Sequence, residues 1–338
     1  MKVADYIANF LAEKGVKRVH MIMGGGAMTI QDAFCSHKEM RGIFYHSEAG
    51  ASYSAFGESK MTNKVSVCSP TTGIAGVNAM AGLLSAWQDS APVLFISGNV
   101  PVAQTTMNAI VDGSSPRQVG IQENNILAMV QSTVKQTFFV WKPENIRNVL
   151  ERAFELCMTG RKGPVWIDVP ADVSNMEIDP DTLDWDGPLQ NKEATWRKNK
   201  IRATFQKIME SEAPLILAGN GIHTADCRED FEKLIKKYKV PFVTTFLGVD
   251  LLPEHRLNIG RIGIKGTRAG NFALQNCDKL LVLGSCLNTS HVGYLPETFA
   301  GGSEIFSVDI DSNRTTLVEE TVIWSDLVNF FKAIEDNE

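Results

Sequence analysis

The sequence has no apolar run of about 18 residues, the length a helix needs to cross a bilayer, so no membrane segment is predicted. Its 33 Lys and Arg residues are interspersed with 39 Asp and Glu residues, giving a formal net charge of -6. Because no basic stripe is present to neutralise phosphates, nucleic acid is not an expected partner. The first 19 residues alternate charged and apolar positions, unlike the apolar region of a signal peptide. We therefore expect a cytoplasmic protein.

Cysteines are few and widely separated. They are Cys35, Cys68, Cys157, Cys227, Cys277 and Cys286. None forms the close pairs typical of zinc or redox motifs, so we expect free and mostly buried thiols. Low-complexity segments and short repeats are also lacking.

Short apolar segments alternate with helical patterns along most of the chain. The strand-like segments are residues 19–23, 65–68, 93–97, 165–169, 214–218, 242–245, 279–283 and 305–310. The helix-like segments are residues 3–15, 76–87, 146–159, 201–209, 231–238, 267–275 and 327–334. This alternation predicts an α/β fold with doubly wound, mainly parallel sheets.

Two domains are expected, because 338 residues with 44% hydrophobic content exceed what one core of about 250 residues encloses. Residues 175–200 are rich in Asp, Pro, Asn and Lys and show little periodicity. We interpret them as a linker between a first domain, residues 1–174, and a second domain, residues 201–338.

Three consecutive glycines, Gly24, Gly25 and Gly26, stand between a predicted strand and a predicted helix. Glycine can bring bare backbone close to a ligand or turn the chain sharply, and the pattern leaves both interpretations open. The spacing is not that of a phosphate loop, because no Gly-Lys-Ser/Thr follows.

Glu48 lies between an apolar strand and a stretch of small residues suited to a packed helix. An ionised carboxyl there would be costly to bury, so it should acquire a partner or stay protonated. The alternative is a surface glutamate that caps a helix.

Small polar residues also follow the next predicted strands. Thr72, Gly73 and Asn78 come after one of them, and residues 97–99 end another. The carboxyl ends of parallel strands share one edge of a sheet, and open α/β sheets bind ligands there. The sequence therefore predicts a binding site at this edge.

The ordered set of these segments resembles the pyrimidine-binding domain of the acetolactate synthase family of thiamine diphosphate enzymes. The segments are residues 24–26, His-Ser-Glu-Ala-Gly-Ala at 46–51, Thr72-Gly73 with Asn78, Asp-Ser-Ala-Pro at 89–92, Ser-Gly at 97–98, Gln-Glu at 122–123 and residues 163–170. Residues 219–221, 263–271, 283–285 and 308–311 are similar to segments of that family's central, Rossmann-like domain.

The resemblance implies a role for each matching residue. Glu48 would hydrogen-bond the aminopyrimidine ring of thiamine diphosphate and promote its imino tautomer, and Gln122 would approach the cofactor from a loop. The other implied cofactor-binding residues are Gly24, Gly25 and Gly26 beside the reacting carbon, and Thr72, Gly73 and Asn78 around the pyrimidine.

The implied reaction is decarboxylation and carboligation of 2-oxo acids such as pyruvate. In the family, the pyrimidine domain of one subunit faces the diphosphate domain of another, so a homo-oligomer is expected. No segment matches the family's Gly-Asp-Gly and Asn motif for magnesium, so we assign no metal ligand here. We expect Mg and the diphosphate to be held by a domain on another chain, without which this chain would be inactive. The glycines of the second domain leave FAD open.

Other functions remain open at this point. A 2-oxo acid decarboxylase component is one, a non-catalytic binding or regulatory protein is another, and a nucleotide-binding protein that uses only the second domain is a third. Ile74, where the family usually has proline, and Ser47, where histidine is common, weaken any assignment of a particular substrate.

Overall fold

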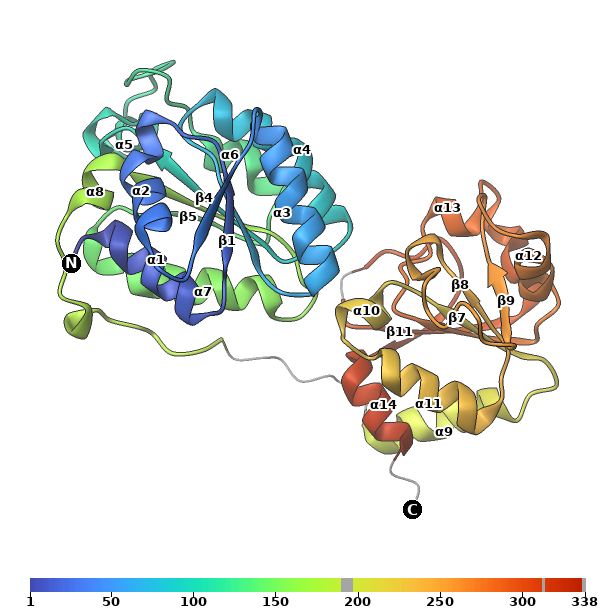
Figure 1. Ribbon diagram of the computed structural model, residues 1–338. Coiled ribbons are helices and arrows are strands. Elements are labelled where there is room, and N and C mark those ends of the chain that lie inside the picture. Colours follow the sequence, from blue (N-terminus) through green and yellow to red (C-terminus); the bar gives the residue numbers. More distant parts are fainter. Residues whose placement is uncertain (190–196, 312–313, 336–338) are drawn as a thin grey trace. The chain divides into compact units, whose positions relative to one another are not determined.

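The computed structural model describes residues 1–189, 197–311 and 314–335, and the chain forms two compact units, residues 1–191 and 192–338 (Figure 1). Each unit contains a six-stranded sheet whose paired strands are all parallel. Helices connect the strands, so the predicted fold class of two doubly wound α/β domains is confirmed.

The sheet of the first unit has the strand order β2-β1-β3-β4-β6-β5. Its strands are β1 (Arg18–Met21), β2 (Arg41–Phe44), β3 (Ser66–Ser69), β4 (Val93–Asn99), β5 (Thr137–Phe139) and β6 (Val165–Pro170). Its helices are α1 (Val3–Glu13), α2 (Met28–Ser36), α3 (Glu48–Thr62), α4 (Ile74–Gln88), α5 (Thr106–Val111), α6 (Ile126–Val130), α7 (Ile146–Met158) and α8 (Ala171–Asn175).

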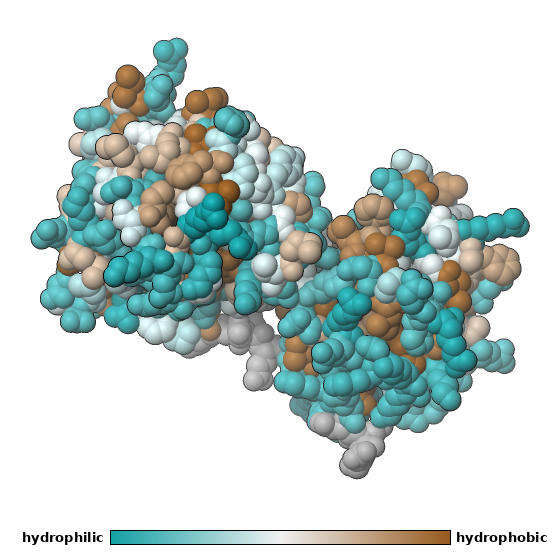
Figure 2. Space-filling view, in the orientation of Figure 1, coloured by the Kyte–Doolittle hydropathy of each residue, from teal (hydrophilic) through white to brown (hydrophobic). Residues whose placement is uncertain are grey.

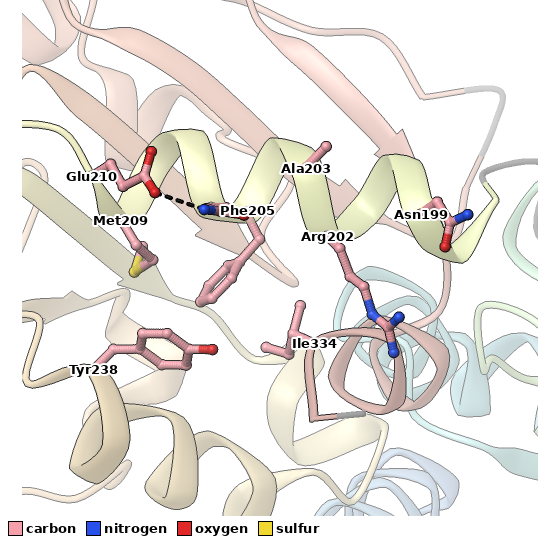
Figure 3. A pocket seen from close by; sticks show the side chains of 9 residues that line it. Asn199, Arg202, Ala203, Phe205, Met209, Glu210, Tyr238 and Ile334 are labelled. Atoms are coloured by element: carbon pink, nitrogen blue, oxygen red, sulfur yellow. Dashed lines mark hydrogen bonds between the residues drawn. The ribbon is translucent and has the colours of Figure 1, made fainter. Parts of the chain in front are cut away.

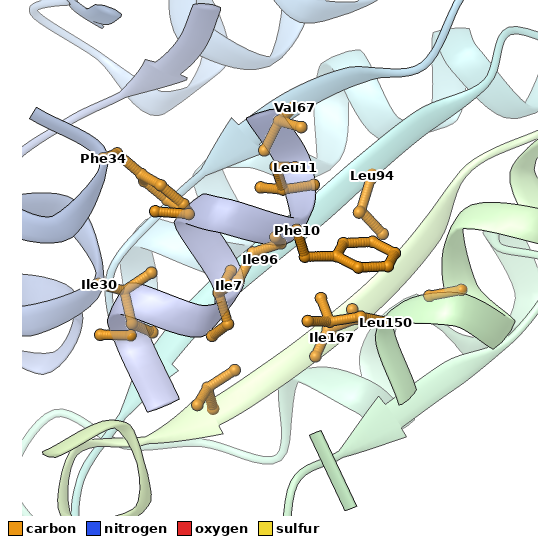
Figure 4. Packing of buried hydrophobic residues seen from close by; sticks show 14 of the residues in the cluster. Ile7, Phe10, Leu11, Ile30, Phe34, Val67, Leu94, Ile96, Leu150 and Ile167 are labelled. Atoms are coloured by element: carbon orange, nitrogen blue, oxygen red, sulfur yellow. The ribbon is translucent and has the colours of Figure 1, made fainter. Parts of the chain in front are cut away.

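Two hydrophobic cores cover the two faces of this sheet. On one face, α1, α2 and α7 bury side chains such as Ile7, Phe34 and Leu150 against β3, β4 and β6 (Figure 4). On the other face, α3, α4 and α6 pack around Phe95 and Trp166, whose rings stack with centroids 4.8 Å apart. Burial on both faces explains why these strands are continuous apolar runs in the sequence.

Helices α3 and α4 approach each other through small residues. Their buried contacts include Ala51, Ala55 and Ala79, and a Cβ added to Gly82 would lie 2.4 Å from the backbone carbonyl carbon of Ser52. The sequence of small residues after Glu48 is therefore a packing surface for α4.

The sheet of the second unit has the order β12-β11-β10-β7-β8-β9. Its strands are β7 (Pro214–Ala218), β8 (Phe242–Thr244), β9 (Asn258–Arg261), β10 (Lys279–Leu283), β11 (Glu304–Asp309) and β12 (Thr321–Trp324). Its helices are α9 (Lys198–Met209), α10 (Gly221–Thr224), α11 (Arg228–Tyr238), α12 (Arg268–Gln275), α13 (Thr289–Val292) and α14 (Leu327–Glu335). One core is formed with α9, α11 and α14, and the other with α12 and α13.

The structure adds detail that the sequence pattern did not predict. Strand β12 follows β11, so the predicted strand at residues 305–310 is not the last one. Part of the predicted linker packs on the first unit, because Leu183 is buried in its core and Arg147 donates a hydrogen bond of 3.1 Å to the Leu183 carbonyl. Residues 190–196 of that linker lie outside the described residues, and α9 begins at Lys198.

All six cysteines are free, but only Cys68, Cys157 and Cys227 are buried. Cys35 and Cys286 are exposed, so the expectation of mostly buried thiols is wrong for these two. Among the described helices, none combines the length and apolar character needed to span a membrane.

Gly82→Ala should destabilise the first unit by about 1–3 kcal/mol, because the added methyl must push α3 and α4 apart. Gly57→Ala is the matched control, since Gly57 lies inside α3 and its added Cβ would meet nothing within 4 Å. It should stabilise the unit by about 0.5–1 kcal/mol through helix propensity. Urea unfolding of both variants checks this, and equal effects would contradict close helix packing at Gly82.

Candidate functional site

The glycine turn after β1 lies against the turn that follows β3. A Cβ added to Gly24 would lie 2.3 Å from Thr71 Cγ2, and one added to Gly26 would lie 1.6 Å from Thr72 Oγ1. Gly25 differs, because an added Cβ there would meet nothing within 4 Å. The first and third glycines are therefore required by packing, and the middle one borders open space.

The turn after β3 is in turn covered by the loop that carries Gln122. Gly73 has φ +69°, and an added Cβ would lie 1.7 Å from the backbone oxygen of Gln122. Gln122 itself has φ +56° and is exposed. Thr72 Oγ1 donates a 3.2 Å hydrogen bond to the carbonyl of Gly98 at the end of β4. The turns after β1 and β3, the end of β4 and the Gln122 loop thus form one connected cluster, here called the glycine cluster.

Glu48 is the first residue of α3, and it has a partner on α4. Asn78 Nδ2 donates to Glu48 Oε2 over 2.6 Å. Ser47 caps the helix, because its Oγ accepts from the Gly50 amide over 3.2 Å. Glu48 is partly exposed, and no other partner is described for its Oε1. Glu48 thus has a specific partner in Asn78, which lies in the second turn of α4. It also stands partly exposed at the start of α3, so both interpretations from the sequence remain.

The Glu48 carboxylate also acts on the end of β3. Burial, and then the charge of Glu48, raise the pKa of the Cys68 thiol. Cys68 precedes Ser69 and the Thr71–Thr72 turn in the chain. Glu48 follows β2, which is parallel to β1, so it lies at the same carboxyl edge of the sheet as the Gly24–Gly26 turn.

Two buried carboxyl groups that the sequence reasoning did not single out lie below the Gln122 loop. Glu123 accepts hydrogen bonds from the Thr106 amide at 3.1 Å, from the Thr106 hydroxyl and from the Val119 amide at 3.0 Å. It thereby ties the start of α5 and the middle of the loop after α5 to the residue that follows Gln122. In the sequence, the indication of this role is the acidic residue that directly follows Gln122.

Asp168, near the end of β6, is the second of these groups. It accepts hydrogen bonds from Ser97 Oγ at 2.6 Å and from Asn99 Nδ2 at 2.7 Å, and Ser97 Oγ also accepts from Trp166 Nε1. Burial raises the pKa of Asp168 to about 7, although the bonds from Ser97 and Asn99 lower it, and the charge of Glu123 raises it further. This network fixes the end of β4 beneath the glycine cluster.

Large apolar side chains surround the cluster without being covered. Met23 is 55% exposed, Ile74 is 75% exposed and Ile121 is 81% exposed, each next to a glycine or glutamine of the site. Figure 2 shows apolar groups among hydrophilic ones at the end of the first unit that carries the loop after α5. Exposed apolar groups of this size around a site are typical of a surface that another protein part covers.

The glycines of the second unit serve its backbone packing. A Cβ on Gly219 would lie 2.3 Å from the Gly284 oxygen, and one on Gly221 would lie 2.5 Å from Gly284 Cα. The amides of Gly219 and Gly221 already donate to the carbonyls of Leu283 and Gly284. These two amides are therefore not available to a phosphate. FAD stays a prediction.

A groove of about 660 Å³ lies elsewhere, on the second unit between α9, α11 and α14 (Figure 3). Phe205, Met209, Tyr238 and Ile334 line it, and Arg202 Nε donates to the Ala333 carbonyl over 2.6 Å at the end of α14. It contains none of the predicted site residues. In the described parts of the chain, no group of three or more His, Cys, Asp or Glu side chains could hold a metal ion.

Comparison with known proteins gives two family matches and a set of relatives. Residues 1–127 match the thiamine pyrophosphate enzyme N-terminal TPP binding domain, and residues 201–334 match the thiamine pyrophosphate enzyme central domain. The chain is 32% identical over 316 residues to a probable acetolactate synthase large subunit of Methanocaldococcus jannaschii, covering 92% of this chain and 51% of that protein.

Two further relatives have the same name and similar coverage. The acetolactate synthase large subunit of Corynebacterium glutamicum is 31% identical, over 92% of this chain and 48% of that protein. The acetolactate synthase isozyme 1 large subunit of Escherichia coli is 29% identical, over 91% of this chain and 52% of that protein. The chain thus spans about half the length of the curated relatives it matches.

Gly73→Ala should displace the Gln122 loop and destabilise the first unit, because the methyl would overlap the Gln122 carbonyl. Gly15→Ala is the control, since Gly15 has φ +85° but an added Cβ would meet nothing within 4 Å. The control should cost about 1–2 kcal/mol for its positive φ alone. Gly73→Ala should cost about 1–3 kcal/mol more, because of the overlap with Gln122 and of a ψ of -124° that L-residues avoid at positive φ. Urea unfolding measures both, and equal losses would show that the Gln122 loop does not lie on Gly73.

Asp168→Asn should remove a pH dependence of stability. Because folding raises the pKa of Asp168 from 3.8 to about 7, the folded state binds more protons than the unfolded state between these values. The contribution of Asp168 to the free energy of unfolding therefore falls by about 1.4 kcal/mol per pH unit as the pH rises through this window. Urea unfolding at pH 5 and 7 should show a steeper loss for the wild-type chain than for the variant, and parallel profiles would contradict this.

Proposed function

This chain belongs to the thiamine pyrophosphate enzyme family through its N-terminal and central domains, and we propose that it acts in an acetolactate synthase-like enzyme on 2-oxo acids such as pyruvate. Its part is to bind the pyrimidine half of thiamine pyrophosphate, also called thiamine diphosphate. The single observation that carries this proposal is the Glu48–Asn78 pair, which stands on the same sheet edge as the glycine cluster.

The residues at this edge fit an aminopyrimidine ring. Ser69 Oγ and Thr71 Oγ1 are buried and have no hydrogen-bond partner among the described residues. Gly24 has no side chain, so the space beside the Thr71 hydroxyl that a Cβ would occupy is left open. Unpaired buried polar atoms are costly, and these two lie at the edge where we propose that the ring binds.

Each residue then has a defined task toward the bound cofactor. Asn78 donates to Glu48 Oε2, so Oε1 would be the oxygen that accepts a hydrogen bond from the pyrimidine ring. Glu48 would thereby favour the imino tautomer of the ring. Gly25, which borders open space, would lie beside the reacting carbon, and Gln122 would approach the cofactor from its loop. When bound, the cofactor supplies the nucleophilic carbon for decarboxylation and carboligation of the 2-oxo acid.

The rest of the cofactor site is proposed to come from residues outside this sequence. The diphosphate and magnesium would be held by a diphosphate domain, which we assign to a partner chain that carries one, in a complex with one or more copies of this chain. Support comes from the exposed side chains of Met23, Ile74 and Ile121 around the glycine cluster, since a facing domain would cover them.

Glu48→Gln should weaken thiamine diphosphate binding about 10- to 100-fold, because a charge-assisted hydrogen bond is replaced by a neutral one. Isothermal titration of the cofactor with magnesium, into this chain alone and into its mixture with a chain carrying the diphosphate domain, measures this. We expect tight binding only in the mixture, together with carbon dioxide release from pyruvate.

Glu39→Gln is the control, because Glu39 makes an exposed ion pair with Lys17 and has no contact with the site. It should bind the cofactor like the unmodified chain. Absence of binding in a verified complex would contradict the proposed function and favour a non-catalytic protein.

A further inference from the structure

A row of polar side chains connects the turn before Glu48 to the centre of α3 through β1. Tyr45 Oη lies 2.8 Å from His20 Nδ1, and His20 Nε2 lies 2.6 Å from Glu58 Oε2. Glu58 Oε1 accepts from Arg18 Nε at 3.0 Å and from Arg18 Nη2 at 2.7 Å. Neither the family comparison nor the proposed cofactor chemistry uses these residues.

Burial makes the hydrogen bonds of His20 important to the fold. His20 is only 5% exposed, so its ring nitrogens depend on protein partners. Burial raises the pKa of Glu58, but the hydrogen bonds from Arg18 and His20 outweigh it and leave the pKa below the usual value. An ionised Glu58 only accepts, so His20 Nε2 carries a proton. The other ring nitrogen, Nδ1, forms the hydrogen bond with the Tyr45 hydroxyl.

The segment that this row holds is short and leads directly to Glu48. The Tyr45 amide donates to the Met21 carbonyl over 3.2 Å, extending the β1–β2 pairing by one residue. Among the contacts described for residues 45–47, the Tyr45–His20 bond is the one side-chain hydrogen bond to the sheet. Both His46 and Ser47 are exposed. The orientation of this turn therefore depends strongly on Tyr45.

The start of α3 needs such a tether. Gly50 and Gly57 weaken the helix by about 1 kcal/mol each relative to alanine. Glu58 holds the later part of the same helix to β1 through His20, and Tyr45 holds its entrance to the same ring. One buried imidazole thus fixes two points on either side of Glu48 along the chain.

We propose that Tyr45, His20 and Glu58 form a positioning relay that fixes the entrance of α3 and thereby aims the Glu48 carboxyl at Asn78. The catalytic consequence rests on the proposed function, whereas the ordering of the turn does not. Tyr45 and His20 are positioning residues, because they act on the cofactor only through Glu48.

The first test uses hydrogen exchange in the 338-residue chain. Tyr45→Phe removes only the hydroxyl, and the amides of Tyr45, Gly50 and Ala51 should then exchange roughly two- to tenfold faster, as expected for one lost hydrogen bond. Tyr53→Phe is the matched control, because Tyr53 lies on α3, is exposed, and has no described hydrogen bond. It should leave these rates unchanged.

If Tyr45 has a purely structural role, Tyr45→Phe will accelerate exchange across the whole first unit, and the proposal is wrong. Unchanged rates in Tyr45→Phe would also overturn it. Nitrogen-15 spectra of the histidine rings give an independent signature. His20 should be the Nε2-protonated tautomer, and its Nδ1 resonance should shift in Tyr45→Phe and stay in place in Tyr53→Phe. An unshifted Nδ1 resonance would remove the relay.

Cofactor affinity in the complete enzyme then separates this proposal from the proposed function. Tyr45→Phe should weaken thiamine diphosphate binding several-fold. In a chain that already carries Glu48→Gln, it should cause little further loss of affinity, because both changes act through one carboxyl. If Glu48→Gln leaves binding unchanged, the proposed function fails while the exchange result stands. If Tyr45→Phe and Glu48→Gln weaken binding additively, the relay does not act through Glu48 and the proposal is wrong.

Discussion

Close backbone contact at the carboxyl edge of the first sheet is the constraint on which the candidate site depends. Gly24 and Gly26 lie against Thr71 and Thr72, Gly73 lies under the carbonyl of Gln122, and a Cβ on Gly98 would meet the Gly26 backbone at 2.1 Å. Any side chain at these places would separate the turns. Because the turns touch, residues that are far apart in the chain share one small surface, and that surface is rigid where the backbone is packed and open at Gly25.

Charge at this edge is arranged in two layers. At the surface, one oxygen of the Glu48 carboxyl accepts from Asn78, and the other has no described partner. Below it, Glu123 and Asp168 are buried and fully engaged with amides and hydroxyls, so they hold the Gln122 loop and the end of β4 in place. The Tyr45–His20–Glu58 row adds a tether on the β1 side. A partly exposed acid with buried polar support is the arrangement that precise ligand binding requires.

The second unit contrasts with the first, although both have parallel six-stranded sheets. Its glycines at the ends of β7 and β10 contact one another, and their amides are bonded to backbone carbonyls. Similar sequence patterns therefore have different physical meanings in the two units. In the first unit, the glycines lie at a sheet edge where two hydroxyls have no described partner. In the second unit, the glycines at the strand ends pack against one another.

The sequence by itself determined the α/β alternation, the central strands and the residues at the strand ends, because apolar runs and glycine turns are local signals. It missed the edge strands β5, β9 and β12, which are short and only partly buried and so lack a strong apolar pattern. It singled out Glu48 and Asn78 but not their 2.6 Å bond, and it gave no role to His20, Glu58 or Asp168. Those pairings join residues tens of positions apart, so only the folded sheet, which brings the strand ends together, decides them.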